Sequence, residues 1–329
     1  FQFAANKNHP KAITELGKLY EYGLGVKEDK QMAFKLYQKA DNFGDPEGSY
    51  RLGLCYLKGI CTESNSEKAA SLFEKASALE NADAKLELGL MLLKGQGVSR
   101  DTQQAAKLFQ EAANLGNVEA SVELGKCYMH GIGIQANERT AFNIFKRARE
   151  KNNLSGTFRL AQCYRKGRGG VRQSHTNAFD LFLTLHKKNY SPGTYELAVC
   201  YLEGSGVDQN TEIGLKLLNQ AVDQEYPKAM NLLGQCYLYG KFVKVDKDRA
   251  VELFDKAAEA GCKLAKVNLA QCLIGGMGIE KNEQEGFKLL QEASDGSAAK
   301  LRIGICLLKG AGVTQNEKEG LALIQSAAE

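Results

Sequence analysis

Apolar residues recur along the chain with helical spacing. From Leu52, apolar side chains stand at Leu52, Cys55 and Tyr56, which is the i, i+3, i+4 spacing of one helix face. A second apolar stripe follows in residues 66–80, where alanines and a Leu-Phe pair give a close-packing face. No segment alternates apolar and polar residues with the period of two typical of a strand. The pattern therefore predicts an all-α chain.

The pair of stripes returns nine times. Successive pairs begin 34 to 37 residues apart, at Leu16, Leu52, Leu88, Leu124, Leu160, Leu197, Leu233, Leu269 and Ile303. One helix pair of this size cannot bury its apolar face alone, whereas stacked pairs can. The expected fold is an all-α solenoid of about nine helix pairs with a 36-residue period. The chain starts with what looks like the tail of a second helix and ends in a second helix.

Short signals mark where the helices begin and end. A Gly-x-Gly closes the first helix, because glycine adopts the left-handed backbone found at helix C-termini. Three repeats depart from this pattern: the second reads Gly59-Ile60-Cys61, the fifth has an extra residue in KGRGGV, and the seventh reads GKFVKV. We expect altered turns in these loops, where the array would bend or bind. Second helices are expected to take their N-caps from Ser66, Thr102, Asn282 and Asn316.

The full repeat reads Ala-x-x-x-Leu-Gly-x-x-Tyr-x-x-Gly-x-Gly-Val, then Ala-x-x-x-(Leu/Phe)-x-x-Ala. It resembles the Sel1-like repeat family, a relative of tetratricopeptide repeats, over essentially the whole chain. The resemblance implies a right-handed superhelix with the first helices on its concave face, acting as an adaptor or scaffold in protein complexes. We expect residues 1–329 to form a single solenoid taken from a longer protein, because both ends fall within a repeat. Fold alone does not identify the partner.

The cysteines follow the same register. Seven of the nine stand three residues after the leading Leu or Ile: Cys55, Cys127, Cys163, Cys200, Cys236, Cys272 and Cys306. We interpret them as small buried core residues that stay as thiols. Bacterial family members that staple each repeat carry paired cysteines, and this spacing lacks them. A reducing, cytoplasmic compartment is therefore favoured, with bacterial export to a host left open. Cys61 and Cys262 fall in predicted loops and are the more reactive candidates.

The sequence offers no pattern for catalysis or for cofactor binding. The glycines close a helix instead of following a strand, so they do not form a phosphate-binding loop. None of the four histidines has a second ligand at zinc spacing. No nucleophile-and-base motif is evident, and no apolar run reaches the length of a membrane span. We predict no enzyme activity, no cofactor and no metal.

Charge is unevenly distributed along the chain. Residues 139–188 carry 12 Lys or Arg and 2 Asp or Glu, a net charge of +10, whereas the whole chain carries +4. This asymmetry predicts an acidic partner: an acidic or phosphorylated peptide, an anionic lipid headgroup or, least favoured, a nucleic acid. The alternative is a solvated basic surface with no dedicated partner.

The tetratricopeptide register indicates which side chains would face the groove. In repeats two and three these positions are apolar: Tyr50, Leu54, Leu57, Leu86, Leu90 and Leu93. They either form a hydrophobic groove for a partner or are buried by the curvature of the array. In repeats four and five they are mostly polar or basic: Lys126, Met129, His130, Phe158, Gln162, Arg165 and Lys166. Arg168 and Arg172 extend this basic set.

Together these features favour a non-catalytic scaffold that binds a protein or peptide in the concave groove. The alternative is an architectural solenoid that assembles with itself or inside a larger complex. An enzyme or a nucleic-acid binder is less favoured.

Overall fold

The computed structural model describes residue 5 and residues 7–328. Across these residues the chain forms helices joined by short loops, and no strand is present. The start of the chain, where the sequence predicts the tail of a second helix, lies mostly outside the described residues. The final second helix is present as α19 (Glu317–Ala328). The all-α solenoid predicted from the repeat is confirmed.

Each repeat contributes two helices of about equal length. The first helices are α2 (Pro10–Tyr22), α4 (Pro46–Lys58), α6 (Ala82–Lys94), α8 (Val118–His130), α10 (Leu154–Lys166), α12 (Ser191–Glu203), α14 (Pro227–Tyr239), α16 (Lys263–Gly275) and α18 (Ser297–Lys309). The second helices are α3 (Lys30–Asn42), α5 (Ser66–Ala78), α7 (Thr102–Asn114), α9 (Glu138–Glu150), α11 (His175–Lys187), α13 (Thr211–Asp223), α15 (Lys247–Glu259), α17 (Glu283–Glu292) and α19.

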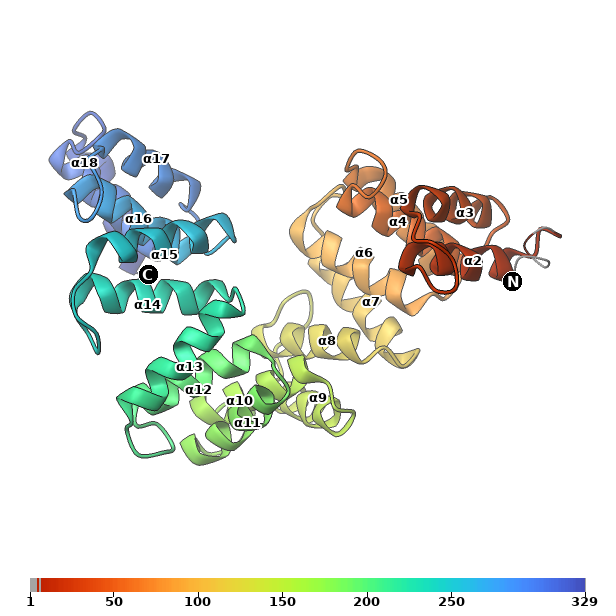
Figure 1. The fold of residues 1–329 in the computed structure, drawn as a ribbon, viewed down its shortest axis with the longest axis horizontal. Helices are drawn as coiled ribbons and strands as arrows, with labels where there is room; N and C mark the ends of the chain where they lie inside the picture. Colours follow the sequence, from red (N-terminus) through yellow and green to blue (C-terminus); the bar gives the residue numbers. More distant parts are fainter. Residues whose placement is uncertain (1–4, 6, 329) are drawn as a thin grey trace. The chain divides into compact units, whose positions relative to one another are not determined.

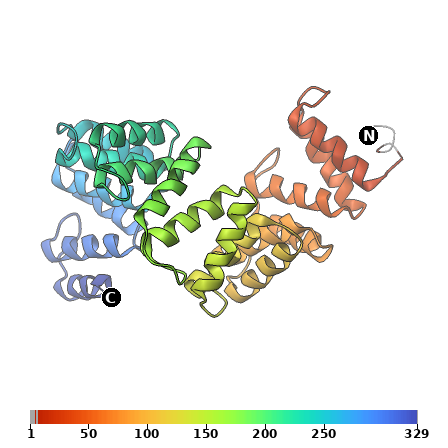
Figure 2. The ribbon, with the colours of Figure 1, turned by 90° about the horizontal axis from the view of Figure 1, so that it is seen from below.

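The chain divides into two compact units, Phe1–Gln173 and Ser174–Glu329. Within each unit, every helix packs against the next one in the chain (Figure 1). Some first helices also contact the first helix of the following repeat, as α2 contacts α4 and α16 contacts α18. Figure 2 shows the same pairing from a second direction. That residues 1–329 act as one solenoid domain stays a prediction.

In five repeats an aromatic ring of the second helix lies on a glycine of the first, in the core of the helix pair. A Cβ atom added to Gly89 would lie 2.5 Å from Cε1 of Phe109, and one added to Gly125 would lie 2.5 Å from Cε1 of Phe145. Both rings are almost fully buried. Because interiors are packed to high density, the glycine is needed to let the ring reach the backbone of the first helix.

The register cysteines are core residues, as the sequence predicts. All seven are buried, and all nine cysteines are free thiols. Burial raises the pKa of Cys55, Cys127, Cys163 and Cys272 to about 11. Cys61 and Cys262 are only partly buried, which agrees with their predicted places outside the core.

Two of the four predicted N-caps are wrong by one residue. Ser66 and Thr102 are the first helical residues, and the caps are Asn65 and Asp101. The Asn65 side chain accepts a hydrogen bond from the Lys68 amide at 2.9 Å. Asparagine and aspartate are at least as good as serine and threonine at this position, so the more N-terminal residue takes the role. The predicted caps Asn282 and Asn316 are confirmed, since each accepts a hydrogen bond from the amide three residues on.

The prediction of altered turns is correct for only one of the three unusual loops. Cys61 and Phe242 replace the second glycine, yet their φ angles are 61° and 70°, in the left-handed region that glycine occupies elsewhere. The same pair of backbone hydrogen bonds closes these loops as in regular repeats, for example from the Asn65 amide to the Tyr56 carbonyl at 2.8 Å. This closure holds the backbone in place although the residue is unfavourable there. Only the fifth-repeat loop, with its extra residue, is rearranged.

Over the residues that the structure describes, none of the helices is both long enough and apolar enough to cross a membrane.

Candidate functional site

A pocket of about 220 Å³ lies between the first helices α8 and α10 of the first unit. It combines six of the predicted groove residues with three that were not predicted. The lining residues are Lys126, Met129, His130, Phe145, Arg159, Gln162, Cys163, Lys166 and Arg168. Repeats four and five therefore bring several of their basic groove positions together in one place.

Three buried side chains form the pocket's apolar part. Phe145 is the ring that packs on Gly125, and it is 1% exposed. Cys163 and Met129 are also buried. Because these side chains belong to the repeat core, the polar groups above them stand on a fixed base.

Two of the cationic side chains are neutralised by neighbouring acids. Lys126 forms an ion pair with Glu123 one helical turn away. Arg168 donates to Glu138 Oε1 from Nε at 2.8 Å and to the Met129 carbonyl from Nη2 at 3.0 Å. Glu138 Oε2 accepts from the Gly169 amide, and the hydrogen bonds from Arg168 and Gly169 lower the pKa of Glu138. Arg168 is thus a structural link that fixes the fifth-repeat loop onto α8 and α9.

The other two permanent cations carry no acidic partner. Arg159 donates to Gln162 Oε1 at 3.0 Å, and its guanidinium lies 5.8 Å from the centre of the Phe158 ring. Lys166 is exposed at the end of α10. Among the described residues, no carboxylate lies within ion-pairing distance of Arg159 or Lys166. The pocket therefore holds two positive charges that the protein itself does not balance.

His130 completes the basic set at the C-terminus of α8. Partial burial is the largest cause that lowers its pKa, followed by the charges of Arg168, Arg159 and Lys166. The carboxylate of Glu138 opposes this effect. Burial first, and the neighbouring cations second, thus favour the neutral imidazole.

Three predicted residues of the middle repeats lie outside the pocket. Phe158 is buried beneath Arg159, at 8% exposure. The carbonyl of Arg165 accepts from Gln173 Nε2 at 2.8 Å, and its side chain does not line the pocket. Arg172 is exposed in the following loop. The structure therefore assembles only part of the predicted basic set.

The apolar positions of repeats two and three are not an open groove. Leu86 belongs to the core at 9% exposure. The other five are partly buried and pack against the same core cluster: Tyr50, Leu54, Leu57, Leu90 and Leu93. The Tyr50 ring lies 5.9 Å from that of Phe73. Their contribution to partner binding remains a prediction.

The sequence reasoning missed Arg159, Cys163 and Phe145 as pocket residues. The register taken from tetratricopeptide repeats places in the groove the residue two before the leading leucine, which is Phe158. The residue that lines the pocket is the one directly before that leucine, Arg159. A signal was present, because residues 159, 162, 163 and 166 follow the i, i+3, i+4, i+7 spacing of one helical stripe.

The second unit contains a pocket in the same repeat register. It lies between α12 and α14, has about 290 Å³, and is lined by Val199, Leu202, Glu203, Leu232, Gln235, Cys236, Tyr239, Lys241 and Phe242. Val199, Leu232 and Tyr239 stand where Lys126, Arg159 and Lys166 stand in the first unit. The repeat thus provides the hollow, and the local residues make it basic or apolar.

Within the part of the chain that the structure describes, no group of three or more His, Cys, Asp or Glu side chains could hold a metal ion.

Comparison with known proteins identifies the repeat. The family model described as Sel1 repeat matches nine segments, residues 10–40, 46–81, 82–117, 118–153, 155–184, 191–226, 227–262, 264–297 and 297–329. None of the curated proteins matches the chain.

Solved structures share the fold at low sequence identity. A protective antigen of uropathogenic Escherichia coli with an SLR fold is 24% identical, with a TM-score of 0.57, over 100% of this chain and 78% of that one. A Sel1 repeat protein from Oxalobacter formigenes is 24% identical, with a TM-score of 0.65, over 74% of this chain and 96% of that one. An immunity protein from Pseudomonas aeruginosa is 18% identical, with a TM-score of 0.52, over 66% of this chain and 82% of that one. These likenesses show the fold alone.

Proposed function

We propose that this chain, which belongs to the Sel1 repeat family, is a non-catalytic scaffold that binds an acidic segment of a partner protein. Sel1 repeats generally mediate protein–protein interactions. In this chain the segment would lie along the first helices of the first unit, with the pocket between α8 and α10 as its charged contact. The function consists of presenting an ordered surface, and it requires no bond to be made or broken.

The observation that carries the proposal is the pocket's unbalanced charge. Arg159 and Lys166 have no acid within ion-pairing distance, and Lys126, His130 and Arg168 lie around them. Unpaired like charges repel each other when they are close, so an arrangement of this kind is stabilised by an anionic ligand. An acidic segment would supply that ligand and would be attracted over a distance by the basic residues 139–173.

The buried thiols fit binding better than chemistry. Cys163 lines the pocket, but burial raises its pKa to about 11, so the thiol is protonated at neutral pH. A protonated thiol is a poor nucleophile. Nine free cysteines also agree with the proposed reducing compartment, such as the cytoplasm.

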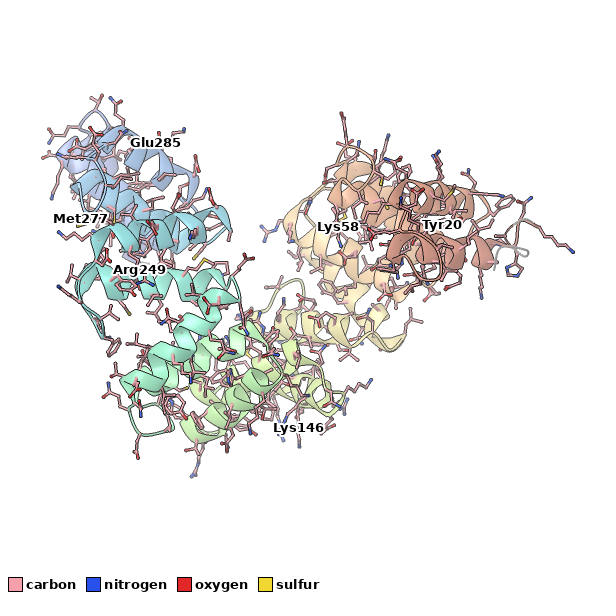
Figure 3. All side chains as sticks on the ribbon, viewed as in Figure 1. Tyr20, Lys58, Lys146, Arg249, Met277 and Glu285 are labelled. Carbon is pink, nitrogen blue, oxygen red and sulfur yellow. The ribbon has the colours of Figure 1, made fainter. Side chains whose placement is uncertain are left out.

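The test is affinity capture from lysate with cross-linking and mass spectrometry. The wild type is compared with a variant that carries Arg159→Glu and Lys166→Glu. A matched control carries Lys146→Glu and Arg149→Glu, which change the same number of charges on α9. Lys146, which Figure 3 labels, is exposed, and the residues that line the pocket do not include it.

We expect a partner that cross-links near α8 and α10, is lost from the pocket variant and is retained by the control. Equal capture by both variants would show that the basic surface has no dedicated partner. Recovery of only further copies of this chain would favour the self-assembling solenoid instead, and sedimentation would measure the size of that assembly.

A further inference from the structure

The charge balance of the pocket between α8 and α10 specifies the kind of anion it can hold. Of its four permanent cations, Lys126 is paired with Glu123 and Arg168 with Glu138. Arg159 and Lys166 remain, which is an excess of two positive charges over a buried apolar base. One carboxylate would neutralise half of this excess. A phosphoryl group carries a charge of about −1.5 to −2 at neutral pH and would neutralise nearly all of it.

The donor groups also suit a phosphoryl group. Arg159 offers a planar guanidinium, which donates hydrogen bonds in pairs to phosphate oxygens, and Lys166 offers a mobile ammonium. The volume of about 220 Å³ has room for a phosphoryl group together with part of the side chain that carries it.

The corresponding pocket of the second unit shows that the fold does not impose these cations. Its residues at the positions of Arg159 and Lys166 are Leu232 and Tyr239, and its cation Lys241 lies 4.9 Å from the centre of the Phe242 ring. The same hollow is therefore stable with apolar residues. The basic residues of the first unit carry an electrostatic cost that core packing does not require.

We infer that the pocket between α8 and α10 binds the phosphoryl group of a phosphorylated side chain in the partner. This inference rests on the proposed scaffold function and names the chemistry that the partner must present. Arg159 and Lys166 contact the phosphate oxygens, and Lys126 and Arg168, each paired with an acid, form part of the pocket wall.

His130 gives the site a dependence on pH. The groups that act on it are Arg168, Arg159 and Lys166, which disfavour its protonated form, and Glu138, which favours that form. A bound dianion reverses the net field, so the pKa of His130 rises and binding takes up a proton. Affinity should therefore increase as the pH falls from 8 towards 6.5, and then decline once the phosphate itself is protonated, at about pH 6.

The experiment follows the four histidines of the full chain by NMR while O-phosphoserine amide is added. His130→Gln assigns the His130 signal. We expect the probe to raise the pKa of His130 by about one pH unit and to leave His9, His175 and His186 unchanged. Glutamate amide at the same concentration should produce a much smaller change. No change at His130, or the same change at all four histidines, would overturn the inference.

Variants locate the binding group. Lys166→Gln and, separately, Arg159→Gln should abolish the His130 response, whereas Lys146→Gln should preserve it. Lys166 and Lys146 are both exposed, so neither substitution should impair folding, and the melting temperature checks this point. A full response in Lys166→Gln and Arg159→Gln would place the phosphate elsewhere and refute the site.

Two further experiments distinguish a failure of this inference from a failure of the proposed scaffold function. Phosphatase treatment of the lysate should remove the captured partner, and retention of that partner through the pocket would refute phosphate recognition while leaving the scaffold function intact. Vesicles with phosphoinositide headgroups and a single-stranded RNA are tested as other phosphate sources. If either binds the pocket and a phosphoserine peptide does not, the partner is a membrane or a nucleic acid and the inference fails.

Discussion

Glycines and aromatic rings are matched between the two helices of a repeat. Gly17 faces Tyr37, Gly53 faces Phe73 and Gly234 faces Phe254, with 2.6 to 2.7 Å between a Cβ added to the glycine and the ring. In the sixth and eighth repeats alanine replaces the glycine, and the second helix carries leucine at the position of the ring. In these two repeats a larger residue on the first helix accompanies a smaller one on the second, as dense packing favours. The fifth repeat departs from this rule, because it has Ala161 and keeps the aromatic Phe182.

This matching predicts the effect of one methyl group. Gly89→Ala would bring Cβ to 2.5 Å from Phe109, and the overlap should cost more than the alanine gains in helix propensity. We expect a net loss of about 1–2 kcal/mol, seen as faster amide hydrogen exchange in α6 and α7. Gly275→Ala is the control, because its Cβ would meet Met277 at an ordinary 3.4 Å. Unchanged exchange in Gly89→Ala would mean that the ring moves without cost.

Cysteine reactivity should divide between the two classes of thiol. Burial removes Cys127 and Cys163 from solvent and raises their pKa to about 11, so few of their thiols are ionised at pH 8. Cys61 and Cys262 are only partly buried and should react first. Timed alkylation followed by peptide mass spectrometry measures the order. Early modification of Cys127 would contradict the core assignment of the register cysteines.

At the scale of the helix, an asparagine links neighbouring repeats. Asn81, Asn117 and Asn153 each cap a first helix. Each also donates its side-chain amide to an acid in the first turn of the preceding first helix, as Asn117 does to Asp83 at 2.7 Å. One residue therefore satisfies a free helix amide and joins two repeats.

This double role predicts a larger loss than a simple cap would give. Asn117→Ala should cost about 2 kcal/mol, since both the cap and the link to Asp83 are removed. Asn65→Ala removes a cap that makes no such link and should cost about 1 kcal/mol. Hydrogen exchange of the first turn of each capped helix measures both losses. Equal losses would show that the link between repeats contributes nothing.

At the scale of the whole chain, charge is segregated although the total is small. The net charge of residues 139–188 is +10, whereas that of the whole chain is +4, so the rest of the chain has a net charge of −6. Such a field acts on the rate of encounter more than on the lifetime of a complex. Under the proposed function, this field would speed the approach of an acidic partner, and the pocket residues would slow its dissociation.

The segregation predicts how salt affects binding of an acidic peptide. Raising the salt from 0.05 to 0.5 M shortens the Debye length to roughly 4 Å, so the association rate should fall at least about tenfold. The dissociation rate should change much less. Stopped-flow fluorescence measures both rates. Neutralising Arg147, Arg149 and Lys151, which do not line the pocket, should reduce this salt dependence and leave the dissociation rate in place. Salt-independent association would contradict the long-range role of these residues.

The sequence by itself determined the helix pairs and their stacking. Its nine leading residues, terminal glycines and register cysteines are local signals repeated with one period, and each short-range preference agrees with the next. The prediction from the sequence was wrong where two neighbouring residues could both cap a helix, as at Asn65 and Ser66. It also erred at Cys61 and Phe242, where loop hydrogen bonds hold a backbone that the residue itself disfavours.

Only the tertiary structure decided which charged residues meet. Arg159, Lys166 and His130 come from two helices, and a shift of one position around a helix decides whether a side chain enters the pocket or the core, as Phe158 and Arg159 show. Arg168 and Glu138, which form an ion pair, are 30 residues apart along the chain. Whether a cation has an acidic partner depends on distances between residues that are far apart in the sequence. No local sequence pattern contains these distances.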